Sequence, residues 1–261
     1  MAIDDTSRCP YEAGKWRGAP AQRVASARPS DRPALWRISE VERNAGSASA
    51  LGCMAAWVRG FLARPHPELG RKGSVCPFVP LSLVMDSIWM AEVTEHNPSF
   101  ETISAIITEY RDVFLSREPT SGPEALQKSF LIVFPTLMAE DSGGAALVDK
   151  VQVALKKYFV DMGLMLGEFH SENESPGLRN SEFRPLRSPV PTLAIRHMVE
   201  SDLPFLMRES YPARERSSFL RSYLSRIGKS LNPAKFNQVL DRLIAAEIEL
   251  WSEHQAIGVA P

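Results

Sequence analysis

The chain has 261 residues, a formal net charge of −1 and 44% hydrophobic residues, which suffices for one large or two small globular domains. The near-neutral charge gives no electrostatic basis for nucleic-acid binding, and no run of about 18 apolar residues predicts a membrane-spanning helix. The N-terminus lacks a signal-peptide pattern, and three widely spaced cysteines make neither a disulfide framework nor a zinc-ligand pattern. These totals favour a cytoplasmic protein of a reducing compartment, without nucleic-acid or membrane partners.

The first 36 residues are rich in Arg, Ala, Ser and Pro and have no hydrophobic period. We therefore predict a flexible N-terminal arm over 1–36, with Trp36 at its edge. An α+β domain is expected over 37–210. A helical C-terminal extension of the same domain is expected over 211–261.

Hydrophobic periodicity predicts the elements of the α+β domain in chain order. Helices are expected over 48–62, 100–115 (with Ser99 as N-cap) and 145–162. Strands are expected over 87–94, 129–135, 164–170 and 192–198. The continuous apolar run 130–134 is typical of a central strand buried on both faces. This order predicts an α+β fold with a mixed central β-sheet of about four or more strands and packed helices.

Beyond Ser201 the pattern becomes helical, first over a short segment that ends near Met207. Two amphipathic helices are expected over 214–227 and 233–254, separated by Gly228 and by the Asn232-Pro233 pair. Their apolar content exceeds what a short bundle needs, through residues Leu240, Leu243, Ile244, Ile248 and Leu250. This excess predicts a dimer interface.

Residues 163–199 concentrate the chemistry of the chain. Two of its five histidines, His170 and His197, lie there at or near strand ends, together with the arginines Arg179, Arg184, Arg187 and Arg196. The loop between the strands is stiffened by prolines 176, 185, 189 and 191. A long, stiff, cationic loop predicts a site for an anionic group with an imidazole close by.

Each of these residues also has an ordinary structural interpretation. His170 is a metal or haem ligand or a general base, or it is a surface histidine at a strand end. His197 shares a strand face with Ile195, so it is a second candidate ligand or a buried core histidine. The arginines bind a phosphate or haem propionates, or they pair with nearby acids. Those acids are Glu168, Glu172, Glu174 and Glu182.

The other motifs of the chain give weaker evidence for a function. No phosphate-binding loop, dinucleotide fingerprint, nucleophile elbow or His-Glu-x-x-His pair is present. Cys76 is a candidate nucleophile if a cation lowers the pKa of its thiol, and otherwise a small buried residue before a turn. His66 and His254 are expected to be structural or exposed.

Three segments carry a family resemblance: Cys76-Pro77-Phe78, the strand 129–135, and the Pro176-Gly177-Leu178-Arg179 and Pro185-Leu186-Arg187-Ser188-Pro189 parts of the loop. They resemble an uncharacterised bacterial domain family found near biosynthetic gene clusters, over about residues 50–210. Through Cys-Pro-Phe and the element order, the chain is also distantly similar to the YqcI/YcgG family of haem-dependent N-hydroxylases. The Pro-Ala-His element of that second family is replaced here by Ser175-Pro176-Gly177-Leu178.

The resemblance implies a haem-dependent oxygenase or oxidoreductase, in the narrowest case an N-hydroxylase, that acts on a small nitrogenous metabolite in a biosynthetic pathway. It implies His170 as the iron ligand, because His170 is the nearest upstream histidine, with His197 as second candidate. Arg179, Arg184 and Arg187 would contact the propionates or an anionic substrate. The alternative, based on the missing catalytic motifs, is a non-catalytic anion- or partner-binding protein that dimerises through its C-terminal helices.

Overall fold

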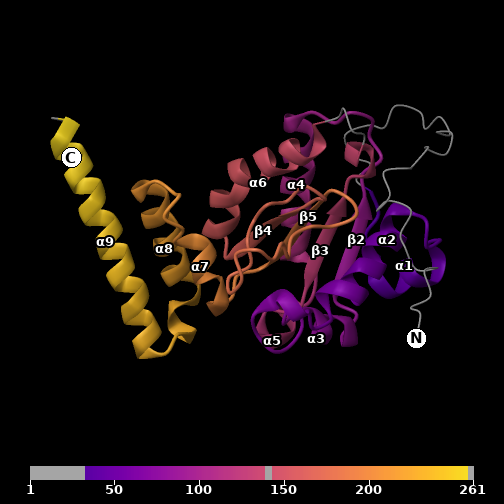
Figure 1. Ribbon diagram of the computed structural model, residues 1–261, viewed down its shortest axis with the longest axis horizontal. Helices are drawn as coiled ribbons and strands as arrows, with labels where there is room; N and C mark the ends of the chain where they lie inside the picture. The colour runs from indigo at the N-terminus through magenta and orange to yellow at the C-terminus, as the bar shows by residue number, and fades with distance from the viewer. Residues whose placement is uncertain (1–32, 139–142, 258–261) are drawn as a thin grey trace. The chain divides into compact units, whose positions relative to one another are not determined.

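A mixed five-stranded sheet organises the protein in the computed structural model, which describes residues 33–138 and 143–257 (Figure 1). Its strands are β1 (Trp36–Arg37), β2 (Ile88–Glu92), β3 (Ser129–Val133), β4 (Leu164–Phe169) and β5 (Thr192–His197). They lie in the order β1-β2-β3-β5-β4, with β1 antiparallel to β2 and β2 parallel to β3. The predicted α+β fold with a mixed sheet is confirmed.

The chain divides into two compact units. The first contains the residues up to Gln152 and Gly167–Ile195, and the second contains Val153–Leu166 and the residues from Arg196 onward. Both units draw residues from helix α6 (Gly144–Asp161) and from strands β4 and β5.

The first unit contains most of the helices and helical turns. They are α1 (Ile38–Asn44), α2 (Ala50–Trp57), the π-helical turn η3 (Val58–Leu62), the 3-10 turn η4 (Pro67–Leu69), α3 (Val79–Val84), α4 (Phe100–Ser116), α5 (Gly122–Ala125) and the 3-10 turn η5 (Pro135–Met138). The second unit contains the 3-10 turn η6 (Glu200–Asp202), α7 (Leu203–Leu206), α8 (Ala213–Ile227), the 3-10 turn η7 (Gly228–Ser230) and α9 (Pro233–Ile257). No helix in the described ranges has both the length and the apolar character needed to cross a bilayer.

Strand β3 is buried on both faces, as its apolar run predicts. Leu131 and Val133 pack in one hydrophobic cluster with Met54 of α2 and Ile88 of β2. Strand residues alternate between faces, so Phe130 points the other way, where its ring makes an edge contact with Phe114 of α4 at 5.0 Å between centroids.

Helix α4 is fixed at both ends by side chains. The Ser99 hydroxyl accepts a hydrogen bond from the Thr102 N–H at 3.2 Å, which confirms the predicted N-cap. At the other end the buried Lys128 ammonium donates to the carbonyls of Phe114 and Arg117, at 2.7 and 2.5 Å. These two carbonyls belong to the last turn and cap of the helix, which have no partner inside the helix itself.

The core of the second unit gathers around α8. Phe219, Leu220 and Tyr223 of this helix pack with Leu206 of α7 and Val239 of α9 in one hydrophobic cluster. The Lys156 ammonium is also buried there and donates to the Phe205 carbonyl at 3.0 Å and to the Tyr211 hydroxyl at 2.6 Å.

The N-terminal boundary differs slightly from the sequence expectation. Trp36 pairs with Met90 as part of β1, and the Pro33 carbonyl accepts a hydrogen bond from the Tyr110 hydroxyl at 2.6 Å. Ordered structure therefore begins before Ile38, because main-chain pairing holds residues that hydrophobic periodicity does not mark. The rest of the predicted arm, residues 1–32, lies outside the described residues.

Candidate functional site

The arginine-rich segment 171–191, here called the 171–191 loop, is closed at its neck by one carbonyl. The His170 oxygen accepts hydrogen bonds from the Asn173 N–H at 3.2 Å and from the Ser188 N–H at 3.3 Å. Asn173 and Ser188 are both buried. The two ends of the loop are therefore held together directly beyond the end of β4.

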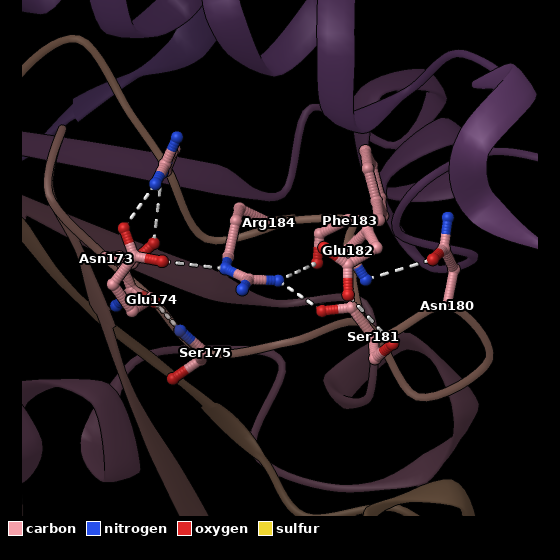
Figure 2. Close-up of polar contacts among 9 residues, drawn as sticks. Asn173, Glu174, Ser175, Asn180, Ser181, Glu182, Phe183 and Arg184 are labelled. Carbon is pink, nitrogen blue, oxygen red and sulfur yellow. Dashed lines mark hydrogen bonds and ion pairs between the residues drawn. The ribbon is translucent and has the colours of Figure 1, made fainter.

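A single carboxylate, Glu174, holds two of the predicted site arginines (Figure 2). Arg184 Nε donates to Glu174 Oε2 at 2.9 Å, and Arg187 Nη2 donates to Glu174 Oε1. Hydrogen bonds from Arg184 and then Arg187 lower the pKa of Glu174, so this carboxylate remains charged near neutral pH. The geometry favours the structural alternative for these two arginines, because both donate to a carboxylate of their own loop.

An aromatic side chain anchors the middle of the loop. Phe183 is 4% exposed, and its ring stacks on the His66 imidazole at 4.7 Å between centroids. Close by, Asn180 Nδ2 donates to the Glu68 carbonyl at 2.7 Å. His66 therefore has the structural role expected for it, and the loop is fixed to the segment after η3.

The tip of the loop, residues 176–180, has two large exposed side chains. Leu178 is 61% exposed, and Arg179 is exposed and has no ion pair within the described part of the chain. The backbone of Arg179 lies against Gly70, where an added Cβ would approach the Arg179 Cβ and carbonyl oxygen to 3.1 Å. Gly70 has a φ of +72°, so both its conformation and this approach require glycine. A second exposed cation, Lys72, follows two residues later.

His170 is buried and polarised by an acid. Only 3% of its surface is exposed, and Nε2 lies 3.0 Å from Oδ1 of Asp149 on α6. In the neutral tautomer that donates to Asp149, Nδ1 carries the lone pair, and this atom is buried without a partner within the described ranges. A carboxylate on the second ring nitrogen is the arrangement found behind metal-ligating histidines. However, no group of three or more metal-ligating His, Cys, Asp or Glu side chains occurs in the part of the chain that the structure describes.

His197 and Arg196 belong to the other unit. The Arg196 guanidinium binds Asp202 with two hydrogen bonds of 2.7 and 2.5 Å, and Asp202 also accepts from the Val199 N–H at 2.8 Å. Asp202 is 1% exposed, so this ion pair has a structural role in the turn after β5. His197 is half-buried at the end of β5. The two candidate histidines therefore belong to different units.

The cysteines differ from one another. Cys76 is half-buried and its thiol is free. Its backbone N–H donates to the Leu62 carbonyl at 2.9 Å. The neighbouring Arg71 guanidinium donates to the carbonyls of Lys72 and Val75, at 3.1 and 2.9 Å, and is thus directed at the backbone. Cys53 is buried, with 1% of its surface exposed.

Together these features define an α+β protein that carries a rigid, internally neutralised loop with an exposed apolar and cationic tip. Residues 51–238 match the model of the family described as Domain of unknown function (DUF6875). This match covers most of the chain, so the chain belongs to that family. No curated protein and no solved structure matches it.

The sequence pointed to the loop but missed the residues that organise it. Glu174 was named only as one of four acids, and neither Asp149 nor the stacking of Phe183 on His66 was anticipated. Asp149 lies 21 positions from His170, and Phe183 lies more than 100 positions from His66. Pairings over such distances are set by how the elements pack, so no local pattern indicates them.

Proposed function

We propose that this protein is a non-catalytic binding protein that recognises an acidic segment of a partner with the tip of its 171–191 loop. The observation that carries this proposal is the exposed pair Leu178 and Arg179 on a loop that is anchored at its neck and at Phe183. Arg179 is the predicted site arginine of this loop without an ion pair among the described residues, and Lys72 adds a second exposed charge.

The anchoring of the loop supports a binding role. The loop is restricted before any partner binds. Its neck is closed at His170, Glu174 binds two of its arginines, and Phe183 is buried. A preorganised loop loses little conformational entropy on binding, so a few tip side chains suffice for measurable affinity. An exposed leucine beside a guanidinium suits a peptide in which a carboxylate adjoins an apolar side chain.

Fluorescence anisotropy with a labelled acidic decapeptide at low salt tests this proposal. We expect Arg179→Gln and Lys72→Gln each to weaken binding by about 3- to 10-fold, since each removes one charge contact near the tip. Arg43→Gln is the matched control, because Arg43 is an exposed cation on α1 of the same unit. Equal losses for all three variants, or no binding by the unaltered protein, would contradict the proposal.

A second candidate is the haem-dependent oxygenase that the family resemblance implies. The buried Nδ1 of His170, with Asp149 on the opposite ring nitrogen, is the observation that favours it. Arg184 and Arg187 do not fit the role of propionate contacts, because Glu174 already holds both, which leaves Arg179. When bound, haem would supply oxygen activation toward a small nitrogenous metabolite.

Absorption spectroscopy distinguishes the two candidates. Protein produced with added haem should show a Soret band that His170→Ala abolishes and His197→Ala leaves in place. The absence of a Soret band in the unaltered protein would remove this candidate. It would leave the peptide-binding proposal unaffected.

A further inference from the structure

Helix α9 carries one apolar row that is covered and another that is not. In Figure 1 it packs beside α8, its neighbour in the second unit. The covered row is Val239, Leu243, Ala246 and Leu250, spaced by four, three and four residues. This spacing keeps all four side chains on one helix face, and Val239 and Ala246 are fully buried there.

Beside it runs a second row, here called the outer row. Its members are Phe236 (38% exposed), Leu240 (37%), Ile244 (48%), Ile248 (59%) and Trp251 (59%). Spacings of four, four, four and three residues place them in one stripe along the helix. Exposed leucines scattered singly need no explanation, but five large apolar side chains in one row mark an interaction surface.

A groove beside α8 has three members of the outer row in its wall, Ile244, Ile248 and Trp251. It is lined by Arg221, Leu243, Ile244, Glu247, Ile248 and Trp251. Arg221 Nη2 donates to Glu247 Oε1 at 2.5 Å, and the Ser217 hydroxyl donates to the same oxygen. The hydrogen bonds from Ser217 and Arg221 lower the pKa of Glu247, so the charges at the groove compensate each other. The groove therefore offers apolar surface and no uncompensated charge.

We infer that a second copy of this chain covers this surface, with the outer row of each copy packed against the outer row of the other. A two-fold interface needs a patch that is complementary to itself. A straight apolar stripe along one helix meets that requirement, because a two-fold axis can place the stripe of one copy antiparallel on the stripe of the other. A partner selected by charge would find no free charge in the groove.

The size of the surface matches a reversible dimer. The outer row runs from Phe236 to Trp251, a rise of about 22 Å along the helix axis. Side chains of this size offer roughly 150–250 Å² each, so the exposed fractions leave about 500 Å² of surface per copy. Two copies would bury about 1,000 Å², the lower limit for a specific interface. We therefore expect a dissociation constant in the micromolar range, about 1–50 µM.

Most of the proposed interface lies in α9, beyond the residues that match the family model. The family model ends at residue 238, so four of the five outer-row residues follow it. The inference is thus independent of the loop tip and of any ligand that the tip binds.

Sedimentation velocity of the full-length protein over about 1–100 µM tests the inference. The mass should rise with concentration from 29.0 kDa toward twice that value. Ile244→Glu should weaken association at least about 10-fold, because it places a charge at the centre of the interface. Ala245→Glu is the matched control: it adds the same charge at the next, exposed position, which lies about 100° around the helix from Ile244.

Two further measurements keep the test decisive. Circular dichroism checks that Ile244→Glu remains folded, and Ile248→Ser replaces it if it does not. Raising the salt from about 0.05 to 0.5 M should leave an apolar dimer intact, whereas association by charge would weaken. A monomer at 100 µM, an equal effect of Ala245→Glu, or dissociation by salt would each overturn the inference.

Discussion

At the scale of single residues, Glu174 determines how many cations the loop exposes. It is itself exposed, yet it binds both Arg184 and Arg187, and its single negative charge offsets one of their two positive charges. The proposed binding activity thus depends on a residue that does not lie at the tip.

Replacing Glu174 by Gln should therefore strengthen binding of the acidic decapeptide. Arg184 and Arg187 would keep their charges but lose their carboxylate, and we expect affinity at low salt to rise about 3- to 10-fold. Amide exchange over 171–191 should also become faster. Glu182→Gln is the control, because Glu182 is exposed in the same loop and has no ion pair among the described residues. Unchanged affinity in Glu174→Gln would show that Arg184 and Arg187 lie out of reach of the ligand.

Lys128 gives a prediction about pH. Burial lowers the pKa of its ammonium from 10.5 to about 8. Between these two values the unfolded chain holds a proton that the folded protein has released, so stability rises with pH in this window. The unfolding free energy of the unaltered protein, relative to Lys128→Met, should increase by about 2 kcal/mol between pH 7 and pH 9.5. Urea titrations of both proteins at each pH measure this difference. A constant difference would show that the ammonium titrates normally.

At the scale of elements, sequence periodicity located nearly all of the long segments. The helices at 100–115 and 145–162 and the apolar strand at 129–135 were predicted almost to their ends, because each buries a continuous face. The short helices α1, α3 and α5 were missed, since four to seven residues carry too few periodic positions to be recognised. Strand β1 was also missed, because its two residues are held by main-chain pairing with β2.

The candidate site was predictable only in outline. The prolines and arginines of residues 171–191 predicted a stiff, cationic loop. This prediction was possible because stiffness and charge depend on local composition. Which arginine remains exposed depends on the reach of Glu174 across the loop, and the stacking of Phe183 on His66 depends on how the loop packs against the segment after η3. Tertiary contacts of this kind leave no local pattern.

The cap of α4 can be tested separately. Ser99→Ala removes the side-chain acceptor for the Thr102 N–H and should destabilise the protein by about 1 kcal/mol. Ser116→Ala, at the other end of the same helix, removes a hydroxyl that only donates to the Val113 carbonyl and should cost less. Thermal or urea unfolding of the two variants gives the comparison. A larger loss in Ser116→Ala would assign the stability of the helix to its C-terminal end.

At the scale of the whole molecule, three elements contribute residues to both compact units. Helix α6 and strands β4 and β5 each cross from one unit to the other, so damage to one unit disturbs elements of the second. We therefore expect a single cooperative unfolding transition.

A matched pair of core substitutions tests this cooperativity. Leu193 in the first unit and Leu220 in the second are both about fully buried, so Leu193→Ala and Leu220→Ala should each cost about 2–5 kcal/mol. Each substitution should lower one common calorimetric midpoint. Two separate transitions, of which only one responds to each substitution, would show that the units unfold independently.

The position of β3 between β2 and β5 has a consequence for how the chain is made. Its partner β2 has left the ribosome when β3 emerges, but β5 begins about 60 residues later. At synthesis rates of roughly 5–20 residues per second, one edge of this apolar strand stays open for about 3–12 seconds. An unpaired edge of such an apolar strand can form main-chain hydrogen bonds with a strand that is not its native partner. The nascent chain should therefore need a chaperone during that interval more than at any other.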